Sequence, residues 1–118
     1  MTNLLTETLE VLSLHGKSFD DIEFISGNGH EISKDDFRRI SSCFYYDDSY
    51  GHVYVPEDLV IAGDSWWLER GEYDGSEWWE YKSKPTRPSK FRRLQSIDGE
   101  EFDKEKYVYD ESEMKCGD

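Results

Sequence analysis

The sequence predicts an α+β fold, a small and mostly antiparallel sheet with one or two helices packed on it. Leucines recur at helical spacing near the N-terminus, which indicates an amphipathic helix. From residue 43 onward, short runs rich in aromatic and β-branched residues are separated by turn residues, which is typical of strands. Aromatic residues make up 15% of the 118 residues, more than a disordered acidic chain carries, so we expect the chain to fold.

Two helices and a small hairpin are expected before residue 43. Leucines at i, i+4 and i+7 predict a helix over about residues 3–15, and Gly16 follows as its stop. The second helix, residues 34–41, begins after Ser33, whose hydroxyl can cap it. Between the two helices, residues 27–29 (Gly-Asn-Gly) accept positive φ and so predict a hairpin turn.

Five strands are expected after the second helix. Turn residues separate them, and the last two flank an Asp-Gly turn. The predicted strands are residues 43–46, 52–55, 59–62, 65–70 and 77–82. The last pair forms a tryptophan-rich β-hairpin, because each of its strands carries a Trp-Trp pair.

The loop of this hairpin decides which residues face one another. A three-residue loop over residues 73–75 would set Glu69 opposite Trp79, whereas a two-residue loop would set Glu69 opposite Glu80. Like charges that face one another across a strand pair are destabilising. The sequence therefore favours the three-residue loop.

Each Trp-Trp pair sends one indole to each face of the sheet, because neighbours on a strand point in opposite directions. Two interpretations follow. Both faces can be packed, one by the helices and the other by the C-terminal segment, or one face stays exposed as a contact patch for a partner protein. The residues expected to bind a partner in the second interpretation are Trp66, Trp67, Glu69, Arg70, Glu72, Glu77, Trp78 and Trp79.

Charge divides the chain into three regions. Residues 1–82 carry 18 acidic and 6 basic side chains, whereas residues 83–93 carry 5 basic side chains, no acidic ones and two prolines. Residues 94–118 are acidic again, with 9 acidic and 3 basic side chains. We expect a globular α+β domain over residues 1–84, followed in residues 85–118 by an extended basic linker and an acidic C-terminal segment, docked or partly mobile.

Composition disfavours several classes of function. A net charge of -13 opposes direct binding to nucleic acid, and the longest wholly apolar run, residues 59–62, is far short of the ~20 residues of a membrane span. The N-terminus has no signal-peptide pattern and the chain has only two cysteines, so we expect a cytoplasmic protein with reduced thiols. Its three histidines lack ligand spacing, so we expect no metal and no cofactor.

Two catalytic arrangements compete with a non-enzymatic interpretation. Glu69 and Glu80 on neighbouring strands resemble the carboxylate pair of a glycosidase, with Trp stacking on a sugar. Cys43 and His52 resemble a nucleophile and its base. A solvated acidic face and ordinary strand residues explain both sets more simply, so we predict no catalytic residue and no enzymatic activity.

The segment of residues 58–85, DLVIAGDSWWLERGEYDGSEWWEYKSKP, resembles small uncharacterised proteins encoded in phages and prophages of Gram-positive bacteria. The likeness is clearest in the WWLER…EYDG.EWW pattern and covers about a quarter of the chain. It implies a genomic setting and supplies no catalytic residue.

Together these observations predict a non-enzymatic acidic interaction protein of phage or prophage origin. It would bind a basic surface on a host or phage protein, as a nucleic-acid mimic or inhibitor in one version. One alternative is a small ligand-binding domain or hydrolase that uses the Trp and Glu residues of the hairpin. The other is a structural protein that self-associates through the hairpin face.

Overall fold

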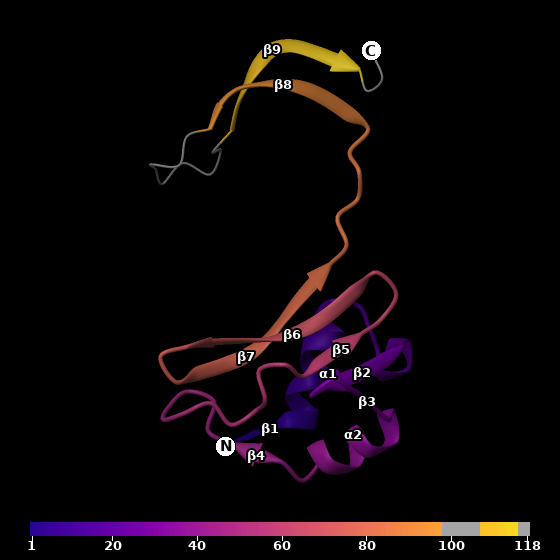
Figure 1. Cartoon of the computed structure of the whole chain (residues 1–118), viewed down its shortest axis with the longest axis vertical. Coiled ribbons are helices and arrows are strands. Elements are labelled where there is room, and N and C mark those ends of the chain that lie inside the picture. The colour runs from indigo at the N-terminus through magenta and orange to yellow at the C-terminus, as the bar shows by residue number, and fades with distance from the viewer. Residues whose placement is uncertain (98–106, 116–118) are drawn as a thin grey trace. The chain divides into compact units, whose positions relative to one another are not determined.

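A computed structural model of the chain describes residues 1–97 and 107–115 (Figure 1). The chain divides into two compact units, Met1–Lys84 and Pro85–Asp118, hereafter unit 1 and unit 2. The fold is α+β, with a mostly antiparallel sheet and two α-helices in the described residues, as the sequence predicts. No helix in that described part is both long and apolar enough to cross a membrane.

Unit 1 contains all of the helices that the structure describes. They are α1 (Leu4–Leu14), the 3-10 helix η1 (Phe19–Asp21) and α2 (Lys34–Ser41). Its strands are β1 (Thr2–Asn3), β2 (Phe24–Gly27), β3 (His30–Ile32), β4 (Tyr45–Tyr46), β5 (Val60–Ala62), β6 (Trp66–Tyr73) and β7 (Ser76–Ser83). β1 pairs with β4, and the other five form one sheet in the order β3-β2-β5-β6-β7 (Figure 1).

Both predicted α-helices are confirmed, and side chains cap their N-termini. The Asn3 side chain accepts a hydrogen bond from the Thr6 backbone N–H at 3.0 Å, which fixes the start of α1. Ser33 Oγ accepts one from the Asp36 backbone N–H at 3.0 Å, which fixes the start of α2. Gly16, with φ of 70°, follows α1 in the left-handed conformation that ends a helix.

The main sheet is antiparallel throughout, and a row of apolar side chains crosses its inner face. Along this row, Ile25 of β2 is paired with Ile32 on one side and with Ile61 on the other. Ile61 is in turn paired with Leu68, and Leu68 with Tyr81 of β7. Residues paired across strands point to the same face, so one side of the sheet forms the floor of the core.

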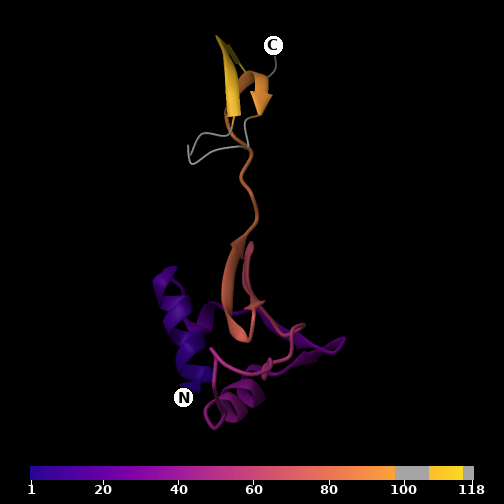
Figure 2. The same cartoon turned by 90° about the vertical axis from the view of Figure 1, so that its left-hand side faces the viewer.

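Each helix packs apolar residues against this inner face. Leu4 and Leu12 of α1 and Phe37 of α2 belong to one core cluster with Ile61 and Leu68. Figure 2 shows α1 along one side of the β6–β7 hairpin. The opposite face of the sheet, hereafter the outer face, carries the remaining alternate residues of the strands.

The predicted strand over residues 52–55 is wrong, since these residues form a loop. The backbone N–H groups of Tyr54 and Val55 donate to the carboxylate of Glu77, at 2.7 and 3.1 Å, where a strand would donate to a neighbouring strand. A side chain from a distant strand thus satisfies this backbone, which no local pattern reveals.

The predicted three-residue hairpin loop is also wrong. Asp74 and Gly75 form a two-residue loop with φ of 49° and 87°, as in a type I′ turn, and Glu69 lies opposite Glu80. Lys82 lies 3.6 Å from a carboxylate oxygen of each of these two glutamates. Its charge offsets the repulsion on which the sequence prediction depended.

Unit 2 contains a second antiparallel strand pair, β8 (Lys90–Ile97) and β9 (Tyr107–Lys115). The predicted basic linker is therefore shorter than expected, because its last four residues belong to β8 and only residues 84–89 lack regular structure. Every residue of β8 is exposed. Within the predicted C-terminal segment, residues 98–106 and 116–118 lie outside the described residues.

Candidate functional site

The β6–β7 hairpin divides its four tryptophans between the two faces of the sheet, as predicted. Trp66 and Trp79 are 4% and 5% exposed and belong to the core. Trp67 and Trp78 are half-buried on the outer face. The alternation follows from the strand pleat, and the helices cover only the first pair.

Four of the eight predicted partner-binding residues lie in the interior, which corrects the expectation that all eight form a contact surface. The side chains of Arg70 and Glu77 are 3% and 1% exposed, and Trp66 and Trp79 are core residues. A partner cannot touch these side chains while unit 1 is folded. The four that reach the surface are Trp67, Glu69, Glu72 and Trp78.

Trp79 is held on the inner face by a hydrogen bond to Thr8 and by a cation–π contact with Arg70. Its Nε1 donates to Thr8 Oγ1 at 2.9 Å, and the Thr8 hydroxyl donates to the Leu4 carbonyl at 2.7 Å. The Arg70 guanidinium lies 4.7 Å from the centre of a Trp79 ring, within cation–π range. The buried indole therefore has a partner for its N–H and ties β7 to α1.

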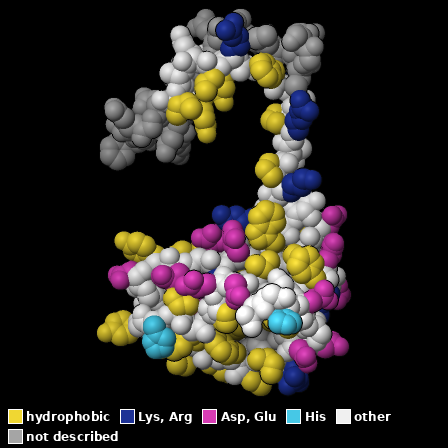
Figure 3. Space-filling view, in the orientation of Figure 1, with side chains coloured by type: hydrophobic (Ala, Val, Ile, Leu, Met, Phe, Trp, Pro, Cys, Tyr) yellow, Lys and Arg dark blue, Asp and Glu magenta, His cyan; other side chains and the backbone are white. Residues whose placement is uncertain are grey.

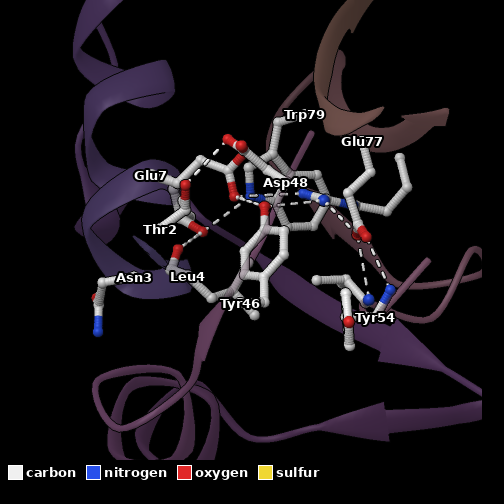
Figure 4. Close-up of polar contacts among 12 residues, drawn as sticks. Thr2, Asn3, Leu4, Glu7, Tyr46, Asp48, Tyr54, Glu77 and Trp79 are labelled. Carbon is white, nitrogen blue, oxygen red and sulfur yellow. Dashed lines mark hydrogen bonds and ion pairs between the residues drawn. The ribbon is translucent and has the colours of Figure 1, made fainter. Parts of the chain in front are cut away.

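The buried carboxylate of Glu77 joins three segments (Figure 4). It accepts hydrogen bonds from the backbone N–H groups of Tyr54 and Val55 and pairs with Arg70 Nη2 at 2.9 Å. A buried carboxylate is tolerated when it is both paired and hydrogen-bonded in this way. Glu77 thus fixes the loop before β5 onto the hairpin.

Tyr46 and Glu7 complete this buried group. Arg70 Nη2 donates to the Tyr46 hydroxyl at 3.1 Å, and Arg70 Nη1 lies 3.5 Å from Glu7 Oε1. The Tyr46 hydroxyl in turn donates to Glu7 (Figure 4). We call Arg70, Glu77, Tyr46, Glu7 and Trp79 the Arg70 cluster.

Two pKa shifts accompany the Arg70 cluster. Burial raises the pKa of Glu7, and the hydrogen bond from Tyr46 and the charge of Arg70 offset only part of this rise. Burial also raises the pKa of Tyr46, and its hydrogen bond to Glu7 adds to the rise because the proton is held between the two oxygens. The Tyr46 hydroxyl therefore stays protonated at neutral pH.

The Arg70 cluster is best explained as a buried polar group that stabilises the fold. Its side chains come from α1, β4, β6 and β7, and four of the five are 5% exposed or less. Glu7 is the exception, with a side chain 14% exposed. Among residues 1–97 and 107–115, His, Cys, Asp and Glu side chains do not gather in a group that would hold a metal ion.

The surface residues of the hairpin form a second group, on the outer face. Successive cross-strand pairs are Trp67 with Lys82, Glu69 with Glu80, and Gly71 with Trp78. A pair of carboxylates therefore lies between two tryptophans. We call these six residues the outer hairpin face.

Polar contacts hold the carboxylates of the outer hairpin face in place. Trp78 Nε1 donates to Glu80 Oε1 at 3.2 Å, and Lys82 Nζ lies 3.6 Å from Glu80 Oε2. The side chains of Glu69, Glu80 and Lys82 are 41%, 38% and 47% exposed. These charges are therefore open to solvent and to a partner.

Gly71 gives the Trp78 indole room to lie across the neighbouring strand. A Cβ at position 71 would lie 2.6 Å from Trp78 Nε1 and 2.5 Å from Glu80 Oε1, closer than atoms in contact. Glycine thus lets the ring and the carboxylate cover the strand backbone, an arrangement found where an aromatic residue shields a strand glycine.

Gly71, Glu80 and Lys82 were not among the predicted partner-binding residues. The Asp-Gly turn was the signal that could have found them, because a two-residue loop sets Gly71 opposite Trp78 and Lys82 opposite Trp67. The Cys43–His52 arrangement receives no support from the contacts. Cys43 is exposed beside Ser42, and the His52 ring packs against Tyr54 at 4.3 Å.

Acidic side chains predominate on unit 1, which carries 18 Asp and Glu and 7 Lys and Arg. Figure 3 shows Asp and Glu side chains spread across its visible face. Comparisons of the chain with protein-family models, with curated proteins and with solved structures find no match.

Proposed function

We propose that the chain is a non-enzymatic interaction protein whose outer hairpin face docks on a basic surface of another protein. The observation that carries this proposal is the composition of that face, in which two half-buried tryptophans flank a pair of exposed carboxylates. Tryptophan supplies much of the binding energy at protein interfaces, and carboxylates select basic partners.

The apolar part of the surface extends beyond the hairpin. Trp67 is paired with Ala62 of β5, and Ala62 with Phe24 of β2, so the two aromatic side chains lie on the outer face on either side of the buried Ala62. Phe24 is 43% exposed. Apolar side chains beside a carboxylate pair provide both the desolvated centre and the charged rim of a docking surface.

The charge of unit 1 favours a partner with a basic surface. Its excess of acidic side chains attracts positive charge over about 8–10 Å at physiological salt and accelerates encounter with a basic partner. Proteins that bind nucleic acid present such surfaces, so the chain would act as an inhibitor if it occupied one. Because the hairpin segment resembles phage and prophage proteins, we expect the partner to be a host or phage protein.

Affinity capture from a Gram-positive lysate tests the proposal with three baits of matched design. These are the wild type, the double variant Glu69→Gln/Glu80→Gln and the control Glu10→Gln/Asp20→Asn, which removes the same charge from two exposed positions away from the hairpin. Circular dichroism first verifies that all three are folded.

We expect a protein that the wild type and the control retain at low salt, that raised salt releases, and that the hairpin variant loses. Trp67→Ala and Trp78→Ala should each weaken its binding by about tenfold or more, the loss typical of a central interface tryptophan. Equal capture by all three baits, or capture of no protein, would contradict the proposal.

A further inference from the structure

A second surface feature of unit 1 lies away from the hairpin, beside α2. It is a pocket of about 310 Å³ between α2 and the loop that leads into β5. Apolar side chains form most of its wall, among them Phe37 and Ile40 of α2, Phe44 after it, and Val55 and Leu59 of the loop. Its volume lies at the lower end of the range for small-molecule sites.

Ser41, also in the wall, is the feature that marks this pocket. The residue is 1% exposed, and its Oγ has no hydrogen-bond partner in the described part of the chain. A helical serine commonly donates to the carbonyl four residues earlier, and a buried hydroxyl without a partner is destabilising. Neighbouring atoms cover this Oγ in the structure, so a polar group on a bound molecule would supply the missing partner once the hydroxyl turned toward the pocket.

The walls also restrict the charge of an occupant. Among the residues that the structure describes, Asp36 is the one charged residue that lines the pocket, and its carboxylate pairs with Arg39 at 3.1 Å. An anionic ligand such as a fatty acid is disfavoured because the described lining of the pocket offers its carboxylate no cationic partner. Apolar walls hold water poorly, so a largely apolar occupant gains from leaving water.

We infer that this pocket is a binding site for a small neutral molecule, mainly aromatic or aliphatic, that carries one hydroxyl or carbonyl group hydrogen-bonded to Ser41. The apolar body would contact the α2 side chains and Leu59. The site shares no residue with the outer hairpin face, so the inference stands independently of the proposed function.

The test compares three probes that share the naphthalene ring system and differ only in their substituent: 2-naphthol, naphthalene and 2-naphthoate. Each is titrated into the full-length, isotope-labelled protein while chemical shifts are followed by NMR. We expect 2-naphthol to shift the resonances of Phe37, Ile40 and Leu59, and to bind about two- to tenfold more tightly than naphthalene, the factor that one net hydrogen bond supplies. The anionic 2-naphthoate should bind most weakly.

Two variants with matched controls locate the site. Ser41→Ala should remove the preference for 2-naphthol over naphthalene, whereas Ser13→Ala, at an exposed helical serine, should keep it. Ile40 is 55% exposed, so Ile40→Asp should leave the fold intact and abolish binding, whereas Leu14→Asp, at an exposed leucine of α1, should not.

Several results would overturn the inference. They are the absence of shifts at the pocket residues with millimolar 2-naphthol, shifts centred on Trp67 and Trp78 instead, and binding that Ile40→Asp leaves unchanged. A wild type that binds naphthalene as tightly as 2-naphthol would remove the role given to Ser41.

Discussion

Glu77 is a polar residue of the hairpin whose removal should strongly destabilise unit 1. Its carboxylate pairs with Arg70 and accepts two backbone N–H groups. Glu77→Ala would leave the buried guanidinium with only the longer ion pair to Glu7, and would remove the acceptor of the Tyr54 and Val55 N–H groups. We expect a loss of about 3–5 kcal/mol in the free energy of unfolding, measured by urea denaturation.

The matched control for this loss is Glu72→Ala. Glu72 lies directly opposite Glu77 in the hairpin, but it is exposed. Its removal should change the free energy of unfolding by no more than about 0.5 kcal/mol, as at most surface positions. Equal effects of the two substitutions would show that the Arg70 cluster does not stabilise the fold.

The raised pKa of Glu7 predicts how stability depends on pH. The folded chain holds the Glu7 proton more tightly than the unfolded chain, whose carboxyl titrates near its ordinary pKa of 4.5. The stability that this group contributes is therefore full below pH 4.5 and is lost as the pH rises through the folded pKa. As the pH rises from 4.5 through the folded pKa of Glu7, the free energy of unfolding of the wild type should fall relative to that of Glu7→Gln.

Asp21 should show the opposite dependence and serves as the internal comparison. The backbone N–H and hydroxyl of Ser18 donate to its carboxylate, at 2.7 and 3.2 Å, and lower the pKa of Asp21. Its contribution is present above its ordinary pKa of 3.8 and is lost as the pH falls through the folded value. Carboxyl ¹³C NMR titration measures both folded pKa values, and a Glu7 midpoint at or below 4.5 would contradict the first expectation.

At the scale of the elements, two glycines that lie under tryptophan rings should respond differently to substitution. A Cβ at Gly63 would lie 2.1 Å from Cε2 of the buried Trp66, which the core holds in place. Gly63→Ala should lower the free energy of unfolding by about 1–3 kcal/mol, as overpacking of a core does.

Gly71→Ala should leave stability almost unchanged, because the half-buried Trp78 and the Glu80 side chain can move aside. Movement of the Trp78 ring should appear as a shift of its indole N–H resonance and as greater quenching of its fluorescence by acrylamide. If Gly71→Ala destabilised the fold as strongly as Gly63→Ala, the Trp78 ring would be fixed rather than free to move.

The elements that the sequence predicted correctly are those determined by residues close together in the chain. Ser33 marked the start of α2, leucine spacing marked α1, and the pleat placed one indole of each Trp-Trp pair on each face. The hairpin register could not be predicted from charge repulsion, because Lys82 lies near both Glu69 and Glu80 and offsets part of their repulsion.

The interior location of Arg70 and Glu77 depends on contacts distant in sequence. Charged residues are almost never fully buried unless they are paired, and alternation on a strand does not name the pair. The loop that covers Glu77 begins more than twenty residues earlier, and Tyr46 and Glu7 come from still further away. Four of the eight predicted partner-binding residues therefore lie in the interior and not at the surface.

At the scale of the whole molecule, unit 1 contains a complete core of its own. All members of the core cluster lie between Leu4 and Tyr81, and the Arg70 cluster and the pocket beside α2 lie within the same range. A two-stranded sheet such as β8–β9 is marginally stable alone in water. Stability of the chain should therefore reside in residues 1–84.

Truncation after Lys84 tests this division. We expect residues 1–84 to fold alone, with a free energy of unfolding within about 0.5 kcal/mol of that of the same transition in the full chain, because every core residue that the structure describes is kept. The control is truncation after residue 75, which deletes β7 and with it Glu77 and Trp79, and which should not fold because the Arg70 cluster and the core are then incomplete. Urea denaturation followed by tryptophan fluorescence reports on both truncations, since all four tryptophans lie in β6 and β7. A molten or unfolded 1–84 fragment would show that residues 85–118 stabilise the core that unit 1 is expected to form unaided.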